Sequence, residues 1–185
     1  MKDIILTGPK HSGKTSAGKA LALLGLFEFI DIDELILQRT GKTPRELFNC
    51  APEIFKKAEE EAAASLFIAN NTNLGGKRRV IAAGGGIIDN PQAVSIIKKS
   101  DAKIVFLSIS ANKAWSRISA DGELPPFLQT ENACLAACEM SSEEIHRALH
   151  EKRAAAYLQI ADFIINAEEK TLEEIAAEIL KQCQR

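Results

Sequence analysis

Residues Gly8 to Thr15 read GPKHSGKT, and this stretch decides the fold of the chain. It matches the pattern G-x-x-x-x-G-K-[ST], in which glycines let backbone N–H groups point inward at phosphates. The apolar run Ile4 to Leu6 comes immediately before it, and a helix-like segment, Ser16 to Leu24, follows it. Because both flanks fit a strand, a phosphate loop and a helix, we predict that the chain binds a nucleoside triphosphate. A glycine-rich turn with an incidental Lys-Thr is the alternative.

The loop contributes most of the candidate nucleotide contacts. Lys14 is expected to reach the β- and γ-phosphates, and to be solvated until a nucleotide binds. Thr15 is expected to offer its hydroxyl to a magnesium ion that bridges the same phosphates. The candidate cofactor-binding residues of the loop are Gly8, Pro9, Lys10, His11, Ser12, Gly13, Lys14, Thr15 and Ser16.

The composition is that of an ordinary globular domain. With 185 residues, of which 46% are hydrophobic and 26% charged, we expect one domain over residues 1–185. The net charge of -2 and the scattered Lys and Arg residues argue against a nucleic-acid partner. No apolar run approaches the ~20 residues of a membrane span, and Met1 leads straight toward the first strand without a signal-like segment. We therefore expect a cytoplasmic monomer that acts on a small molecule and has no membrane partner.

Cysteine and histidine spacings do not indicate a metal site. The irregular cysteines, which we expect to be free thiols, are Cys50, Cys134, Cys138 and Cys183. His146 and His150 stand four residues apart on an expected helix, without the Glu of an H-E-x-x-H motif. We expect them to form a histidine pair on the surface.

Two further segments end in residues suited to a ligand site. Phe27 to Ile30 is an expected strand that leads into Asp31 and Asp33, and Val80 to Ala83 leads into three glycines, 84–86. Ligands of open α/β sheets bind at the carboxyl ends of strands, so both carboxylates should approach the phosphates. Glycines there let the backbone come close to a substrate. The alternatives are that Asp33 only caps the next helix and that the glycines only make a tight turn.

Strand and helix patterns alternate along the whole chain. The expected strands are 4–6, 27–30, 80–83, 103–109 and 162–165, and the longer expected helices are 16–24, 34–39, 52–70, 91–99, 111–120, 141–157 and 171–183. This rhythm predicts an α/β fold, a P-loop NTPase three-layer sandwich with a five-stranded parallel sheet and helices on both faces. Residues from about 121 to 142 break the rhythm, and we expect them to form a lid, with a disordered loop as the alternative.

P-loops occur in several enzyme classes, so the reaction has to be inferred from the rest of the chain. A compact domain with a late lid suits a phosphotransferase that closes over its acceptor, and a GTPase-like N-K-x-D string is absent from the sequence. The motifs together resemble the shikimate kinase family over nearly the whole chain. The matching strings are GPKHSGKT, F-x-D-x-D-E-x-I-x-x-R-T-G from Phe29 to Gly41, the later GGG, and K-R-x-x-x-Y from Lys152 to Tyr157.

The resemblance implies an ATP-dependent kinase that uses Mg²⁺ and phosphorylates the 3-hydroxyl of shikimate in aromatic amino acid biosynthesis. By that likeness Lys14 and Asp33 are catalytic, with Asp33 holding the acceptor hydroxyl. Asp31 joins Thr15 at the magnesium ion, and Arg117 lies against the adenine. The implied substrate-binding residues are Asp33, Lys56, Gly84, Gly85, Gly86 and Arg153.

Two departures from the family pattern concern the acceptor. The family's F-R-x-x-E string is here Phe55 to Glu59, with Lys56 at the arginine position. Lysine keeps the charge but loses the bidentate fork of a guanidinium. The lid string R-P-L-L is here Leu124 to Phe127, which has no cation at the arginine position. A kinase of another hydroxylated small molecule, and a nucleotide-binding protein without kinase activity, therefore remain alternatives.

Overall fold

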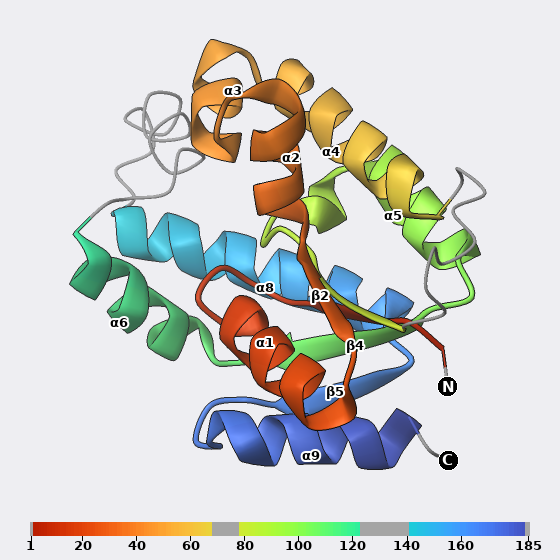
Figure 1. Cartoon of the computed structure of the whole chain (residues 1–185). Coiled ribbons are helices and arrows are strands. Elements are labelled where there is room, and N and C mark those ends of the chain that lie inside the picture. The colour runs from red at the N-terminus through yellow and green to blue at the C-terminus, as the bar shows by residue number, and fades with distance from the viewer. Residues whose placement is uncertain (1, 68–77, 123–140, 184–185) are drawn as a thin grey trace.

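A computed structural model describes residues 2–67, 78–122 and 141–183, and within them five parallel strands form one sheet (Figure 1). The strands are β1 (Ile4–Thr7), β2 (Glu28–Asp31), β3 (Arg79–Ala82), β4 (Lys103–Ser108) and β5 (Phe163–Asn166). Their order in the sheet is β2-β3-β1-β4-β5. The predicted α/β fold with a five-stranded parallel sheet is confirmed.

Helices alternate with the strands as the sequence pattern predicts. They are α1 (Lys14–Gly25), α2 (Ile32–Thr40), α3 (Pro44–Cys50), α4 (Pro52–Phe67), α5 (Pro91–Lys99), α6 (Ala111–Asp121), α8 (Ser142–Ile160) and α9 (Leu172–Cys183), with a short 3₁₀ turn, η1 (Ile87–Asp89). The expected continuation of α4 to residue 70, most of the expected lid, Leu124, Cys134 and Cys138 lie outside the described residues. Within the described ranges, no helix has both the length and the apolar character needed to cross a membrane.

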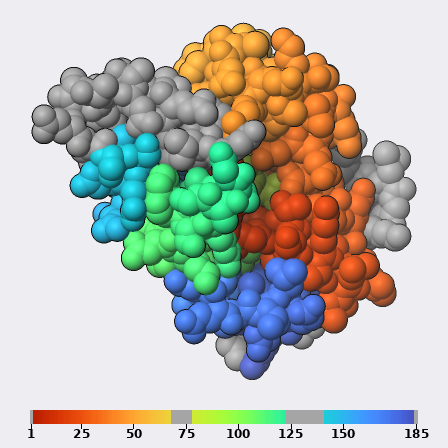
Figure 2. All heavy atoms as spheres, turned by 90° about the vertical axis from the view of Figure 1, so that its left-hand side faces the viewer, coloured from red at the N-terminus to blue at the C-terminus, as the bar shows by residue number. Residues whose placement is uncertain are grey.

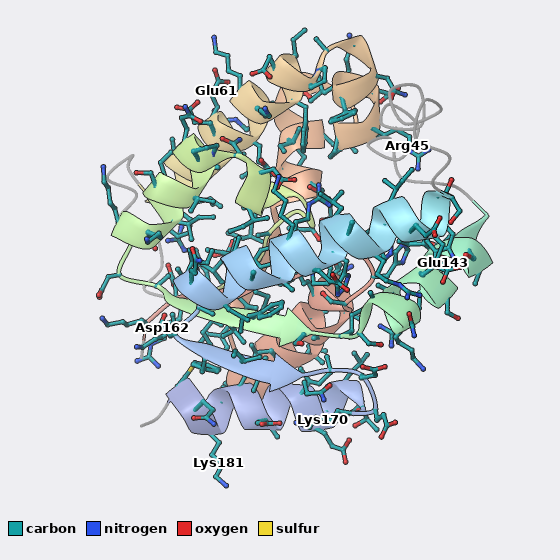
Figure 3. All side chains as sticks on the ribbon, turned by 180° about the vertical axis from the view of Figure 1, so that it is seen from behind. Arg45, Glu61, Glu143, Asp162, Lys170 and Lys181 are labelled. Atoms are coloured by element: carbon teal, nitrogen blue, oxygen red, sulfur yellow. The ribbon has the colours of Figure 1, made fainter. Side chains whose placement is uncertain are left out.

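Alternating strand residues form a core on each face of the sheet, because successive side chains of a strand point to opposite sides. Ile4 and Leu6 of β1 pack with α1 and α9, whereas Ile5 packs with α4, α5 and Tyr157 of α8. Figure 1 shows α1 in front of the sheet and α8 behind it, and Figure 3, seen from behind, shows α8 in front. These three layers are the sandwich that the sequence predicts.

The strand order brings three loops to one edge of the sheet. Strands β2, β3 and β1 are neighbours, and the register aligns Asp31 with Ala82 and Ala82 with Leu6. The segments that follow these strands are the start of α2, the glycine turn 84–86 and the phosphate loop. Because all three strands are parallel, their carboxyl ends meet at the edge where ligands of such sheets bind.

The expectation of a surface histidine pair is wrong. His146 and His150 of α8 are 5% and 7% exposed, and the Nε2 atom of His150 lies 3.0 Å from the carbonyl oxygen of Ile109. The His146 ring lies 5.4 Å from the ring of Trp115 in α6 and 5.6 Å from the ring of His150. The spacing of four does place both on one face of α8, but that face packs against α6 and the end of β4. Cys50 and Cys183 are free thiols, as expected.

Candidate active site

The phosphate loop connects β1 to α1 through backbone conformations that suit glycine. Gly8 and Gly13 have φ values of 142° and 87°, and His11 between them has φ of 62°. A methyl carbon placed on Gly8 would lie 2.5 Å from the carbonyl oxygen of Leu107 in β4, so a larger residue does not fit there. The loop is therefore built for close backbone approach, as its motif predicts.

Lys14 is buried inside this loop, which corrects the expectation of a solvated ammonium. Its Nζ donates hydrogen bonds to the carbonyl oxygens of Gly8, at 3.0 Å, and Pro9, at 2.7 Å. Burial lowers the pKa of Lys14 to about 8, and the nearby carboxylates of Asp33 and Asp31 oppose this shift. Carbonyl oxygens of the phosphate loop thus hold the Lys14 ammonium in place.

Thr15 and Asp31 meet at the N-terminus of α1. The Thr15 hydroxyl donates to Asp31 Oδ2 at 2.8 Å, and Asp31 Oδ1 accepts from the Asp33 N–H at 2.9 Å. Asp31, not Asp33, is therefore the N-cap of α2, and the alternative that Asp33 caps this helix is wrong. A hydroxyl beside a carboxylate, both next to a phosphate loop, is the oxygen ligand set that Mg²⁺ prefers, so these residues fit the ion.

Asp33 lies two residues after Asp31 and lines a cavity of ≈ 250 Å³ beside the phosphate loop. Burial, followed by repulsion from Asp31, raises its pKa, while Lys14 and Lys10 oppose the shift. The cavity is lined by Lys10, Asp33, Pro44, Arg45, Phe48, Phe55, Lys56, Glu59, Gly84, Gly85, Gly86, Asp89, Asn90 and Arg153. All six predicted substrate-binding residues lie in this one lining.

The glycine turn joins the walls of the cavity. A methyl carbon on Gly84 would lie 3.1 Å from Asp33 Oδ1 and 3.2 Å from Glu59 Oε1. One on Gly85 would lie 2.8 Å from the backbone nitrogen of Lys10 in the phosphate loop. The Tyr157 hydroxyl donates to the Gly85 carbonyl oxygen at 3.0 Å and fixes the turn from the α8 side. These close approaches explain the glycines better than a tight turn alone.

Comparison with known proteins agrees with this geometry. The family model described as shikimate kinase matches residues 10–184 of the chain. The chain belongs to the shikimate kinase family. A shikimate kinase of Thermodesulfovibrio yellowstonii is 35% identical over 185 residues, covering 100% of this chain and 96% of the relative. One of Caldanaerobacter subterraneus is 31% identical over 182 residues, covering 98% and 95%.

Solved structures of shikimate kinases share the fold over the full length. The Acinetobacter baumannii enzyme, solved in complex with shikimate, is 27% identical with a TM-score of 0.82, and the match covers 100% of this chain and 93% of that one. The Bacteroides thetaiotaomicron enzyme is 26% identical with a TM-score of 0.73, covering 100% and 99%. The recognition of the family from its motifs is confirmed.

In this member of the shikimate kinase family, the two cationic residues predicted to bind the acceptor, Arg153 and Lys56, form ion pairs with carboxylates of the chain itself. Arg153 donates from Nε, at 2.8 Å, and Nη2, at 2.6 Å, to Asp89 Oδ2. Lys56 Nζ lies 3.2 Å from Glu53 Oε1, one helical turn before it in α4, and that pair is largely exposed. Both cations still line the cavity.

Sequence reasoning missed several residues of the lining. Arg45 follows Pro44 in the first turn of α3 and adds a guanidinium to the lining (Figure 3). Glu59 was identified only within a family string, yet it is 1% exposed and its pKa is raised to about 7, chiefly by burial. Asn90 holds it by donating from Nδ2 to Oε2 at 3.0 Å. A charged residue on the apolar face of α4 was the available signal for Glu59.

Arg117 lies beside the phosphate loop. Arg117 belongs to α6, and its Nη1 donates to the carbonyl oxygen of His11 in the phosphate loop at 2.6 Å. The space-filling view in Figure 2 shows the surface hollowed between the orange atoms of the α2 and α3 region and the green atoms of α6. The predicted nucleotide residues, from Gly8 to Ser16 together with Arg117, thus come from two adjoining segments.

Proposed function

We infer that this chain is an ATP-dependent phosphotransferase that transfers the γ-phosphoryl group of ATP to a hydroxyl of shikimate. The observation that carries the inference is the single cavity that joins Asp33, the glycine turn and Arg153 directly beside the phosphate loop. Membership of the shikimate kinase family supports the same reaction. We expect the 3-hydroxyl of shikimate to be the acceptor atom.

Residues of the phosphate loop would bind and orient the triphosphate. Backbone N–H groups at the start of α1 face the phosphates, and Lys14 exchanges its carbonyl partners for phosphate oxygens. Thr15 and Asp31 would hold Mg²⁺, which neutralises charge on the phosphates when bound. Arg117, already placed against the loop, would border the adenine.

Asp33 would orient the acceptor hydroxyl and take its proton as the oxygen attacks the γ-phosphorus. Its carboxylate stands in the cavity beyond the magnesium pair, and its backbone is fixed by the Asp31 cap. A raised pKa makes the carboxylate a better proton acceptor than an exposed aspartate. The water-excluding walls are the glycine turn and the aromatic rings of Phe48 and Phe55.

Arg153, supported by Lys56 and Arg45, would hold the carboxylate of shikimate. These three cations come from α8, α4 and α3 and share the cavity lining. A second candidate function is favoured by the pairing of Arg153 with Asp89, because an acceptor without a carboxylate would leave that pair intact. That candidate is a kinase of a neutral polyol with the same roles for Lys14 and Asp33.

An acceptor panel separates the two candidates. ADP release is measured with ATP and Mg²⁺ in the presence of shikimate, of a second hydroxy acid such as quinate, of a neutral polyol, and with no acceptor. We expect a rate with shikimate that is well above all the others. If ADP release rises only with the neutral polyol, the polyol rather than shikimate is the acceptor. If the rate of ADP release is equal under all four conditions, the protein has no kinase activity toward these acceptors.

A further inference from the structure

Asp89 is a charged residue in the cavity wall that the proposed mechanism does not use. It ends the turn η1 directly after the glycine turn, and its N–H donates to the Gly86 carbonyl oxygen at 2.9 Å. Its side chain is 40% exposed and lines the cavity, whereas the side chain of its partner Arg153 is 10% exposed. Asp89 is thus held at the wall by its backbone, with its carboxylate facing the acceptor space.

The contact between Asp89 and Arg153 uses a whole edge of the guanidinium. Both Nε and Nη2 of Arg153 donate to one oxygen, Asp89 Oδ2, at 2.8 and 2.6 Å. A methyl carbon on Gly86 would lie 3.5 Å from Nη2, so the guanidinium is enclosed between Gly86 and Asp89. A planar guanidinium binds a carboxylate through such paired N–H groups. In this chain the carboxylate of Asp89 already accepts hydrogen bonds from both of these N–H groups of Arg153.

An acceptor carboxylate bound to Arg153 would therefore meet Asp89 as a like charge. In a partly buried cavity such repulsion is stronger than in water, because screening is weak. Burial chiefly raises the pKa of Glu59 in the same cavity wall, and the carboxylates of Asp33 and Asp89 add to that rise. The other expected cation, Lys56, is farther toward solvent and pairs with Glu53.

Resting on the proposed function, we propose that Asp89 is a specificity-determining residue that competes with the acceptor's carboxylate for Arg153. In this competition, the ion pair with Asp89 offsets part of the cost of burying the Arg153 charge. It also weakens the binding of a carboxylate acceptor relative to a neutral one of the same shape. A substitution that removes the charge of Asp89 but keeps the side-chain shape should therefore strengthen the binding of a carboxylate acceptor and leave the binding of a neutral acceptor unchanged.

Asp89→Asn tests the proposal, because asparagine keeps the size and one acceptor oxygen but removes the charge. We expect the Kd and KM for shikimate to fall by about tenfold, the effect of about one like charge. The KM for ATP should stay unchanged. For the carboxamide of shikimate, which is neutral, Kd should change less than twofold. Glu53→Gln is the matched control, since it removes the exposed partner of Lys56, and it should change each constant less than twofold.

Isothermal titration calorimetry measures the Kd of shikimate directly, so the result does not depend on turnover. A shikimate Kd that is equal in wild type and Asp89→Asn, or weaker in the variant, would overturn the competition and assign Asp89 an orienting role. Equal gains for shikimate and its carboxamide would also overturn it, because cavity shape rather than charge would then be the cause. Shikimate that binds neither protein would overturn the proposed acceptor, and the competition with it.

Discussion

Asp33 and Asp31 stand two residues apart but have different partners. Asp31 is engaged by the Thr15 hydroxyl and the N-terminus of α2, whereas Asp33 lines the acceptor cavity. Asp33→Asn keeps the shape of the side chain, and it leaves α2 intact because Asp31, not Asp33, caps the N-terminus of that helix. We expect kcat to fall by about 10²- to 10⁴-fold, as for loss of a general base, with the KM for ATP within about threefold.

Steady-state kinetics with ATP and the acceptor varied in turn check this division of roles. Asp31→Asn is the control, and it should raise the Mg²⁺ concentration needed for half-maximal rate, because it removes a carboxylate from the proposed ion site. A collapse of ATP binding in Asp33→Asn would assign Asp33 to the magnesium site instead.

Glu59 makes folding stability depend on pH in an unusual direction. Its Oε2 accepts from Asn90, and its Oε1 has no hydrogen-bond partner among the described residues. Its pKa is about 7 in the folded protein, against 4.5 when unperturbed. Between these values the folded chain binds more protons than the unfolded one, so the stability contribution is lost as pH rises from about 4.5 to about 7. The loss is on the order of 3 kcal/mol.

Glu59→Gln should remove this loss. We expect urea unfolding at pH 5 and pH 8 to give a free-energy difference that is smaller in the variant than in wild type. The comparison between the two proteins isolates Glu59, because the other carboxylates are common to both. Parallel stability curves for the two proteins would show that Glu59 is not the group responsible.

Among the helices and turns, Asn90 holds the start of α5 to the middle of α4. Its Nδ2 donates to the Lys56 carbonyl oxygen at 2.8 Å and to Glu59 Oε2 at 3.0 Å, and its Oδ1 accepts from the Ala93 N–H at 3.3 Å. Asn90 is 2% exposed, so alanine would remove a cap and leave buried acceptors unpaired. We expect Asn90→Ala to cost about 2 to 4 kcal/mol in unfolding free energy.

Thr43→Ala is the matched control for Asn90→Ala. Thr43 caps the exposed start of α3 and has no buried acceptors to satisfy, so its loss should cost about 1 kcal/mol. Denaturant unfolding of both variants gives the comparison. Equal losses would mean that the links from Asn90 to α4 contribute nothing beyond the cap.

The same elements show how far pattern reasoning extends. Periodicity predicts that α8 exists and that His146 and His150 share a face, but not that α6 covers this face. The D-x-D spacing predicts two carboxylates at the end of β2, but the choice of Asp31 as the cap depends on where the helix begins. The histidine error concerns which helix covers a side chain, which is a tertiary property, whereas the capping error concerns the exact residue at which a helix begins.

At the scale of the whole molecule, the sheet order explains why the site could be largely predicted. Residues that follow neighbouring parallel strands must converge, so Asp33, the three glycines 84–86 and the phosphate loop are foreseeable from the strand pattern. Arg153 is foreseeable only through the family string. The ion pair between Arg153 and Asp89 could not be predicted from the sequence, because nothing in their spacing of 64 residues indicates a contact.

The lid and the oligomeric state stay predictions. The expected lid, about residues 121–142, falls mostly outside the described residues, and the expected monomer and single domain follow from length and composition alone. Arg45 and Phe48 of α3 line the cavity over which such a lid would close.

The central claim is that this cavity and its phosphate loop transfer a phosphoryl group from ATP to shikimate. Phosphorus NMR of a reaction that holds the protein, ATP, Mg²⁺ and shikimate tests it most directly. We predict a new phosphomonoester resonance that grows in step with ADP, and that is absent with Lys14→Ala or without shikimate. ATP that stays intact, or ADP that appears only with inorganic phosphate and at the same rate without shikimate, would contradict the account.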